Sequence, residues 1–309
     1  MDLIQAVREA GVVVPVGAQS QWEVGGPAPD GVAVRARVGI LEYEPADLTV
    51  TVGAGTSFAE LDAALAEHGQ ECPLDPEDER ASIGGVLACG LSGVRRLRHG
   101  PVRDHVLEVR VVTGYGTLIK GGGPTVKNVT GYDVPRLFVG SFGTLGVITQ
   151  VTLRCRPRPE VAQWFIAPRD ANVLRASARI WDGNRVFTLA EGRAVDVATQ
   201  RNGYEPCDAP ARIDGSHRGR ISVAPSEISA VTAKLPAGQW QAELGIGTIH
   251  VAGDLEGARQ TAHAHGGWLL REKGHGDGFG RPLPNLALAR RIKLAFDPEG
   301  KCNPGRLPL

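Results

Sequence analysis

Short glycine-rich segments set between apolar runs are the feature that most constrains this chain. Its 309 residues include 41 glycines, and this share is roughly double the average usage of about 7%. The densest segment, S-I-G-G-V-L-A-C-G-L-S-G, spans residues 82–93, and G-S-F-G-T-L-G spans residues 140–146. Because the intervening apolar residues are spaced as in strands and helices, the glycines predict tight turns or backbone close to a ligand, and not disorder.

The apolar spacing predicts an α+β chain. Strands are predicted over residues 12–17, 39–45 and 48–55, a hairpin over residues 105–122, and a long strand over residues 146–156. Ser57 is expected to cap a helix over residues 58–69, with Glu60 completing a capping box and Gly69 ending the helix.

Pro157 and Pro159 close the long strand, and we place a domain boundary there. The first domain therefore covers residues 1–158. We expect a smaller α+β domain over residues 159–283, with one antiparallel sheet and helices on one face, and a terminal segment over residues 284–309. In the second domain, strands are predicted over 161–168, 185–192 and 242–253, and helices over 171–183, 226–235 and 255–266. We find no sequence repeat.

Charge and composition exclude several classes of protein. Lys plus Arg and Asp plus Glu both number 34, so no global field attracts nucleic acid or an acidic membrane. No apolar run approaches the roughly 18 residues of a membrane helix, and the N-terminus lacks the basic start of a signal peptide. A cytoplasmic protein is expected. The five cysteines are scattered without a C-x-x-C pair, so we predict no metal site.

Two glycine motifs have competing interpretations. Gly53 and Gly55 start a G-x-G-x-x-G pattern, but Phe58 occupies the third glycine position, which argues against a nicotinamide-dinucleotide site. The segment 82–93 suits either an anion such as a diphosphate or close packing of a helix on a sheet, and taken alone it favours neither.

The motifs taken together identify a family. They are S-I-G-G (82–85), G-L-S-G (90–93), R-H-G-P-V-R-D (98–104), K-N-V-T-G-Y-D (127–133), G-S-F-G-T-L-G-V-I-T (140–149), F-D-P-E-G (296–300) and N-P-G-R (303–306). Their order resembles the vanillyl-alcohol-oxidase, or PCMH-type, FAD-binding flavoproteins, and more narrowly the FAD-binding small subunits of bacterial glycolate oxidases. The resemblance implies a PCMH-type FAD-binding domain with two α+β subdomains over residues 1–158. It also implies a cap domain serving substrate or subunit contact, and a terminal segment that returns to the FAD domain.

The resemblance also implies which residues bind FAD. The diphosphate loop after the first strand corresponds to Val16, Gly17, Ala18, Gln19 and Ser20, where relatives usually carry consecutive glycines. Further cofactor-binding residues are expected at Ser82, Ile83, Gly84, Gly85, Gly90, Ser92, Gly93, Arg103, Asp104, Gly143, Thr144, Gly146, Val147, Ile148 and Asn303. Non-covalent FAD is expected, because the first loop has no His and Cys89 lies among small apolar residues.

Oxidation of a 2-hydroxy acid requires a base for the hydroxyl proton and cations for the carboxylate. His275, in the run E-K-G-H-G-D, loosely resembles the Glu-His-Gly motif of larger relatives and is the predicted base. The basic residues Arg95, Arg96 and Arg98 are expected to form a solvated or subunit-facing patch.

The function implied by the resemblance is that of an FAD-dependent oxidoreductase subunit acting on CH–OH donors. It would oxidise glycolate to glyoxylate within a complex containing a second flavin subunit and an iron–sulfur subunit. The alternative is a structural or electron-relay subunit that binds FAD weakly or not at all. A stand-alone 2-hydroxy-acid dehydrogenase is disfavoured by the short second domain, and any membrane association would come through partners.

Overall fold

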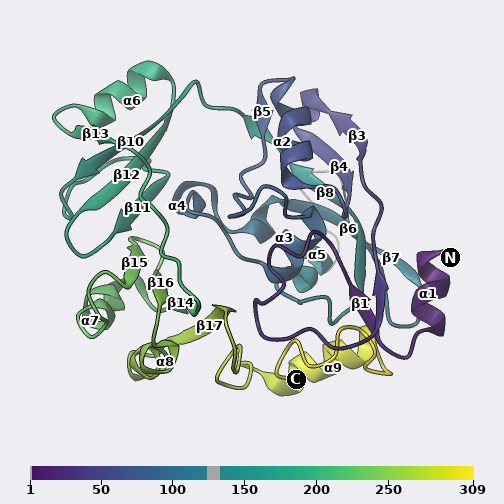
Figure 1. Ribbon diagram of the computed structural model, residues 1–309. Helices are drawn as coiled ribbons and strands as arrows, with labels where there is room; N and C mark the ends of the chain where they lie inside the picture. The colour runs from purple at the N-terminus through teal and green to yellow at the C-terminus, as the bar shows by residue number, and fades with distance from the viewer. Residues whose placement is uncertain (1, 124–132) are drawn as a thin grey trace.

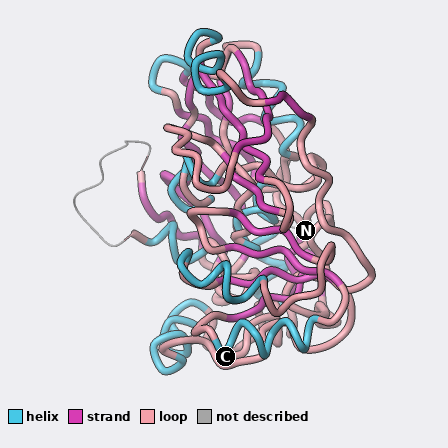
Figure 2. The backbone as a smooth tube through the Cα atoms, turned by 90° about the vertical axis from the view of Figure 1, so that its left-hand side faces the viewer, coloured by secondary structure: helices cyan, strands magenta, loops and turns pink. Residues whose placement is uncertain are grey.

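The computed structural model describes residues 2–123 and 133–309, so most of the predicted K-N-V-T-G-Y-D motif lies outside the described residues. The chain forms two parts, each built on an antiparallel sheet (Figure 1). Seen from the side, strands run through the middle of the molecule and helices gather toward its ends (Figure 2). Within the described residues, no helix combines the length and apolarity needed to cross a bilayer.

The first part contains a five-stranded sheet in the order β3-β4-β8-β6-β7, with every neighbouring pair antiparallel. These strands are β3 (Ile40–Glu44), β4 (Thr49–Gly53), β6 (Val106–Val112), β7 (Leu118–Gly122) and β8 (Val147–Arg154). Helices α2 (Phe58–Ala66) and α3 (Ile83–Cys89) bury their apolar sides in the core of this part. The predicted capping box is confirmed, because Ser57 and Glu60 bond reciprocally at the start of α2.

A smaller parallel pair, β1 (Val13–Pro15) and β2 (Val32–Val34), lies beside this sheet. The C-terminal tail bridges the first residue of β1, since Val13 N donates to Lys301 O and Asn303 N donates to Val13 O, both at 2.8 Å. The short elements of the first part are α1 (Leu3–Glu9), β5 (Gln70–Glu71), α4 (Arg96–His99), α5 (Val134–Phe138) and β9 (Arg156–Pro157).

The second part is an eight-stranded antiparallel sheet in the order β13-β10-β12-β11-β15-β16-β14-β17. Its strands are β10 (Val161–Ala167), β11 (Ala178–Trp181), β12 (Val186–Gly192), β13 (Glu205–Cys207), β14 (Arg218–Ser222), β15 (Trp240–Glu243), β16 (Thr248–Ala252) and β17 (Trp268–Lys273). Its helices are α6 (Ala194–Arg201), α7 (Ile228–Thr232) and α8 (Leu255–Ala264). In Figure 1, α7 and α8 lie on the side of the sheet away from the first part. The predicted α+β fold with an antiparallel second sheet is confirmed.

The eight strands are two copies of one topology. Each unit is read from its outer edge of the sheet toward the centre. In that direction β10 to β13 lie in the order fourth, first, third, second along the chain, and β14 to β17 lie in the same order. This is the order of a ferredoxin-like unit, and the two units join through their second strands, β11 and β15. Helix α7 follows the first strand of the second unit, whereas residues 168–177 of the first unit form a loop. The duplication is one of strand topology, and it is not accompanied by a repeat in the sequence.

That loop corrects one prediction. The helix predicted over residues 171–183 is wrong: the segment is a loop followed by β11, in which Ala178 and Ile180 are buried. Pairing of β11 with strands on both sides outweighs its local helix preference. The single strand predicted over residues 242–253 is a hairpin instead, because Gly245 and Gly247 turn the chain at positive φ. Helix α6 was not predicted.

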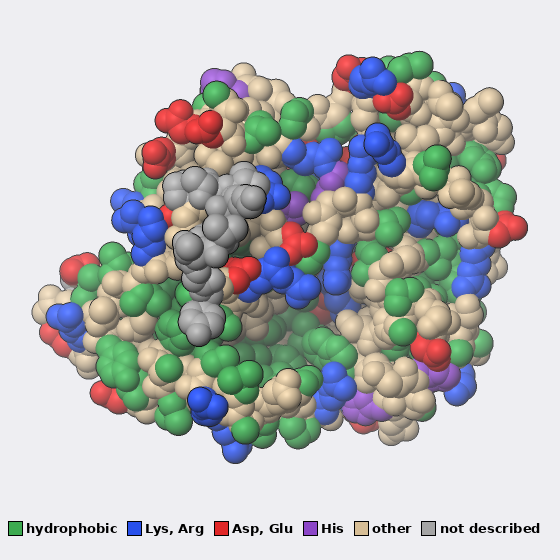
Figure 3. Space-filling view, turned by 180° about the vertical axis from the view of Figure 1, so that it is seen from behind, with side chains coloured by type: hydrophobic (Ala, Val, Ile, Leu, Met, Phe, Trp, Pro, Cys, Tyr) green, Lys and Arg blue, Asp and Glu red, His purple; other side chains and the backbone are tan. Residues whose placement is uncertain are grey.

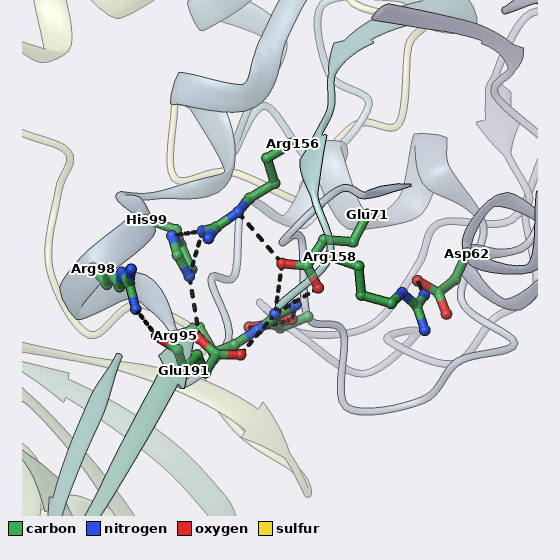
Figure 4. A network of polar contacts seen from close by, with 9 residues as sticks. Asp62, Glu71, Arg95, Arg98, His99, Arg156, Arg158 and Glu191 are labelled. Atoms are coloured by element: carbon green, nitrogen blue, oxygen red, sulfur yellow. Dashed lines mark hydrogen bonds and ion pairs between the residues drawn. The ribbon is translucent and has the colours of Figure 1, made fainter. Parts of the chain in front are cut away.

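A buried polar network joins the two parts (Figure 4). Arg95 forms ion pairs with Asp75 at 2.5 Å and Glu71 at 2.9 Å in the first part, and with Glu191 of β12 at 3.1 Å. His99 also contacts Glu191, at 3.3 Å. Burial alone would lower the pKa of Arg95, but the neighbouring carboxylates outweigh this effect and raise it.

Two more cations complete the network. Arg98 donates to the backbone oxygen of Glu191 at 2.5 Å, and Arg156 contacts both His99 and Glu71. Arg95 and Arg98 therefore bind within the chain and are not a solvated or subunit-facing patch, which corrects the sequence-based expectation. The back of the molecule shows charged side chains of both signs gathered at its centre (Figure 3).

Helix α9 (Leu286–Phe296) connects the tail to the first part. Phe296 packs edge-on against Phe138 with ring centroids 5.4 Å apart. At the end of the helix, the buried carboxylate of Asp297 accepts hydrogen bonds from Lys293 and from Cys302 N, at 2.5 and 2.7 Å. Lys293 also donates to Thr144 O at 2.6 Å. These bonds fix the course of the final residues beside β1.

We expect Arg95→Met to lower the free energy of unfolding by about 3 kcal/mol, because it leaves buried carboxylates without their cation. Urea denaturation of the purified chain measures this change. Arg80→Met removes a cation from the exposed ion pair with Asp78 and is the control. Equal midpoints for the two variants would contradict the role given to the network.

Glu191→Gln should reduce the acid sensitivity of the fold. Burial works against ionisation of Glu191, but the His99 hydrogen bond and the Arg95 charge bring its pKa down to about 2. A depressed pKa stabilises the fold above the ordinary value near 4.5, and this contribution is lost as the pH falls toward 2. Between pH 7 and pH 3 the wild type should therefore lose about 2 kcal/mol more than the variant. Unfolding curves across this range test the difference, with the exposed Glu67→Gln as control.

Candidate functional site

The loop that follows β1 lies between three cavities. We name them by position: an inner cavity and a middle cavity of about 80 Å³ each, and a large cavity of about 480 Å³. The inner and middle cavities share Pro15, Gly17, Ser82, Gly85, Ala88 and Gly143. The middle and large cavities share Gln19, Ser20, Gln21 and Trp22. The three spaces therefore follow one another along the loop.

Backbone segments meet closely at the inner and middle cavities, which we call the glycine groove. A Cβ on Gly17 would lie 2.0 Å from Ser82 Oγ, and one on Gly84 would lie 3.0 Å from the backbone oxygen of Ala54. Ser82 caps α3, accepting a hydrogen bond from Gly85 N. Close approach of main chain around an open space explains why this stretch of sequence is so rich in glycine.

The first loop of the groove is held in an unusual conformation. Gln19 has a φ of +61°, in the left-handed region that favours glycine. Arg306 anchors the far end of the loop by donating to the backbone oxygens of Trp22, Val24 and Gly26 at 3.0, 3.0 and 2.6 Å. The first loop therefore combines a non-glycine residue at positive φ with a clamp from the C-terminal tail.

Most of the predicted cofactor residues line these cavities. Those in the glycine groove are Val16, Gly17, Ala18, Gln19, Ser20, Ser82, Gly84, Gly85, Gly143, Gly146, Val147, Ile148 and Asn303. Ser92 and Gly93 line the large cavity instead. Residues separated by up to 287 positions in the chain, from Val16 to Asn303, are thus brought to one place.

Five predicted residues do not line any of the three cavities. Ile83 belongs to the apolar core, and Thr144 is buried with its hydroxyl donated to Ser141 O at 2.7 Å. Gly90 packs against the backbone of Gly140. Arg103 and Asp104 are half exposed, and their charged atoms are 3.9 Å apart.

The large cavity is bounded on its far side by the second sheet. Arg218 and Arg220 alternate along β14 and share the buried carboxylate of Glu272 at 3.2 and 2.9 Å. Arg220 also donates to Ser92 O at 3.1 Å, which connects this sheet to the first part. The cavity is therefore enclosed by both parts of the chain.

A histidine–carboxylate pair also lines the large cavity. His250 of β16 lies 2.7 Å from Glu243 of β15, and both side chains are mostly buried. Because Ile249 and Val251 pack into the core against α7 and α8, the alternation of the strand directs His250 to the opposite face. This arrangement can hold an imidazole in a fixed orientation for proton transfer.

Acidic residues outnumber basic ones around the large cavity. The acids are Glu23, Asp75, Glu77, Asp78, Asp214, Glu243 and Glu272, and the Arg and Lys residues are Arg212, Arg218, Arg220 and Lys273. Each of these four cations is paired with a carboxylate among the described residues. The site as folded offers a small anion little attraction.

The structure places His275 in an exposed loop after β17, and His275 does not line any of the three cavities. Its assignment as a base stays a prediction. All five cysteines are free, and Cys89 lines the middle cavity. Across residues 2–123 and 133–309, no three His, Cys, Asp or Glu side chains come together as metal ligands would.

Several site residues were missed by sequence reasoning. Trp22, Cys89 and Arg306 line the middle cavity, and Arg306 is the last residue of the N-P-G-R motif. The alternation of Arg218 and Arg220 in R-G-R-I-S was the available signal for a strand with a charged face. No local signal marks His250, because its partner, the carboxylate of Glu243, lies on a neighbouring strand.

The residues present fit a bound FAD. Gly85 lines both small cavities, and a Cβ there would meet only Ser82 Oγ within 4 Å, so this space is open for a ligand. The side chain of Asn303 donates to Phe142 O at 2.6 Å, while its buried Oδ1 has no hydrogen-bond partner in the part of the chain that the structure describes. Three cavities in a row suit a long cofactor with two ring systems joined by a diphosphate.

Comparison with known proteins agrees with this arrangement. A family model described as an FAD binding domain matches residues 1–122, which confirms the prediction of FAD binding. The D-lactate dehydrogenase of Archaeoglobus fulgidus is 41% identical over 118 residues, covering 38% of this chain and 27% of that protein. Glycolate oxidase subunit GlcD of Bacillus subtilis is 39% identical over 129 residues, covering 41% and 27%.

Solved structures support the fold over nearly the full length. Two structures of alkyldihydroxyacetonephosphate synthase align with 98% of this chain at TM-scores of 0.69 and 0.70, with 15% and 16% identity. Glycolate oxidase subunit GlcE of Escherichia coli (strain K12) is 31% identical over 346 aligned positions, covering 98% of this chain and 94% of that protein. The chain therefore belongs to the family of the glycolate oxidase subunit GlcE.

Proposed function

We propose that this chain is the FAD-binding subunit of a multi-subunit enzyme that oxidises glycolate, or a closely related 2-hydroxy acid, to the 2-oxo acid. The observation that carries the proposal is the match to a glycolate oxidase subunit over almost the whole of both chains. The glycine groove supports it, because thirteen of the residues expected from the resemblance to bind FAD line it.

The reaction defines what the site must supply. Conversion of a 2-hydroxy acid to a 2-oxo acid removes two electrons and two protons, one from the carbon and one from the hydroxyl. Bound FAD supplies the two-electron acceptor for this step. The chain itself must hold the cofactor, exclude bulk water and take the hydroxyl proton.

His250 is the described residue best placed to take that proton. It lines the large cavity, and the Glu243 carboxylate 2.7 Å away would stabilise the imidazolium that forms. His275 remains a prediction from the resemblance, and its exposure gives it no comparable setting. The two assignments are distinguished by substitution.

A specific observation favours a second role, electron relay between subunits. A substrate carboxylate needs a free cation, yet the four cations of the large cavity are already paired with carboxylates. In this alternative, substrate is oxidised on a second flavin subunit and this chain passes electrons onward. An iron–sulfur subunit would receive them, and a cytoplasmic location for the complex stays a prediction.

We expect FAD to be held without a covalent bond. Cys89 is the cysteine of the groove, and burial raises the pKa of its thiol to about 12, although Arg306 acts in the opposite direction. The thiolate needed for attachment is therefore scarce at neutral pH. Denaturation should release FAD from the protein.

Gly85→Val should weaken FAD binding by about tenfold or more, because the branched side chain overfills the groove. The dissociation constant is measured by quenching of flavin fluorescence, and mass spectrometry identifies the cofactor released on denaturation. Gly85 is preferred to Gly143, whose φ of +71° would strain any side chain. Gly11→Val, where a Cβ meets nothing within 4 Å, is the control. Unchanged affinity in Gly85→Val would place FAD elsewhere.

Anaerobic mixing of the FAD-loaded chain with glycolate separates the two roles. If this chain oxidises substrate, flavin absorbance should be lost without a partner, and His250→Gln should slow the loss at least about a hundredfold. His275→Ala should then react at the wild-type rate. Loss of absorbance only after a second flavin subunit is added would support electron relay and would exclude His250 as the base.

A further inference from the structure

Arg306 carries a buried positive charge with no carboxylate partner among the described residues. Its exposed fraction is 5%, and the acceptors of its hydrogen bonds are the neutral backbone oxygens of Trp22, Val24 and Gly26. Arg259 is buried to the same extent, but it pairs with Glu256 at 3.1 Å. The two guanidiniums therefore differ in charge compensation and not in burial.

Among the described residues, nothing else near Arg306 neutralises this charge. The Cys89 thiol is its one titratable neighbour of note, and burial keeps that thiol protonated with a pKa of about 12. The Trp22 ring lies 6.0 Å from the guanidinium, at the outer limit of a cation–π contact. Nε is buried and lacks an acceptor. Leaving a charge in this state costs several kcal/mol unless an anion is bound beside it.

The position of Arg306 indicates what that anion is. Arg306 lines the middle cavity, which lies between the inner cavity and the large cavity. In FAD the diphosphate lies between the adenosine and the flavin, so the anionic group of an FAD extended through the three cavities falls in the middle one. Gln19 and Ser20 bring no positive charge to this cavity.

We propose that Arg306 is the charge partner of the FAD diphosphate, supplying the positive charge that the first loop does not bring to the middle cavity. The inference rests on the proposed binding of FAD in the glycine groove. Arg306 would have two roles. Its hydrogen bonds hold the loop from Trp22 to Gly26, and its charge attracts the diphosphate. A lysine retains the charge but cannot reproduce the planar set of donors.

The test compares Arg306→Lys with Arg306→Met in the full chain. Both variants lose the clamp on the loop, while only the methionine loses the charge. Dissociation constants are measured for FAD, and for ADP, which carries the diphosphate without the flavin. We expect Arg306→Met to weaken both ligands at least about tenfold, or about 1.4 kcal/mol, while Arg306→Lys stays within about threefold of wild type. Arg259→Met is the control for loss of a buried arginine, and it should leave both constants unchanged.

Three outcomes would overturn the inference. Equal losses of affinity in the lysine and methionine variants would show that Arg306 acts only through the loop. Weaker FAD binding with unchanged ADP binding would assign the charge to the flavin ring. Wild-type protein that binds ADP but not FAD would contradict the proposed function, whereas wild-type protein that binds neither would contradict both. Thermal unfolding of each apoprotein distinguishes loss of fold from loss of ligand.

Discussion

The arrangement of the site depends on the buried charge network centred on Arg95. Its carboxylate partners come from both parts of the chain, with Asp75 and Glu71 in the first and Glu191 in the second. Desolvation makes each of these charges costly alone, so the network favours the relative placement of the two sheets in which all its partners meet. That placement brings the charged face of β14 toward Ser92 and encloses the large cavity.

The two ends of the site have opposite electrostatic character. The glycine groove has apolar walls and the uncompensated guanidinium of Arg306, so it favours an anionic ligand. The large cavity has more acids than cations, and Glu272 alone occupies both Arg218 and Arg220. A carboxylate substrate entering there would have to displace a carboxylate of the chain, such as Glu272, from its cation, whereas an FAD diphosphate bound in the groove as proposed would meet no acidic side chain among the lining residues.

How much of the molecule could be predicted depended on the range of the interactions. Local signals were sufficient for the capping box of Ser57 and Glu60 and for the glycine segments of the groove. The helix expected over residues 171–183 does not form, because the end of this segment is β11, which pairs with a strand on each side. The carbonyl partners of Arg306 lie more than 270 positions away in the chain. His250 is a candidate base only because Glu243, on another strand, lies beside it. Such contacts leave no local pattern in a single sequence.

These two sets of contacts suggest a division of tasks within the chain. On the proposed function, holding FAD depends on the first part and the tail, where Arg306 donates to the first loop and Asn303 donates to Phe142 O. Binding of substrate would depend on the second sheet. In the isolated subunit, the arginines of this sheet are already paired with carboxylates. Only a change in the partners of Glu77 and Glu272 would free Arg218, since it contacts both. On the proposed function, substrate binding by this chain would therefore require these ion pairs to change, whereas FAD binding in the glycine groove would not.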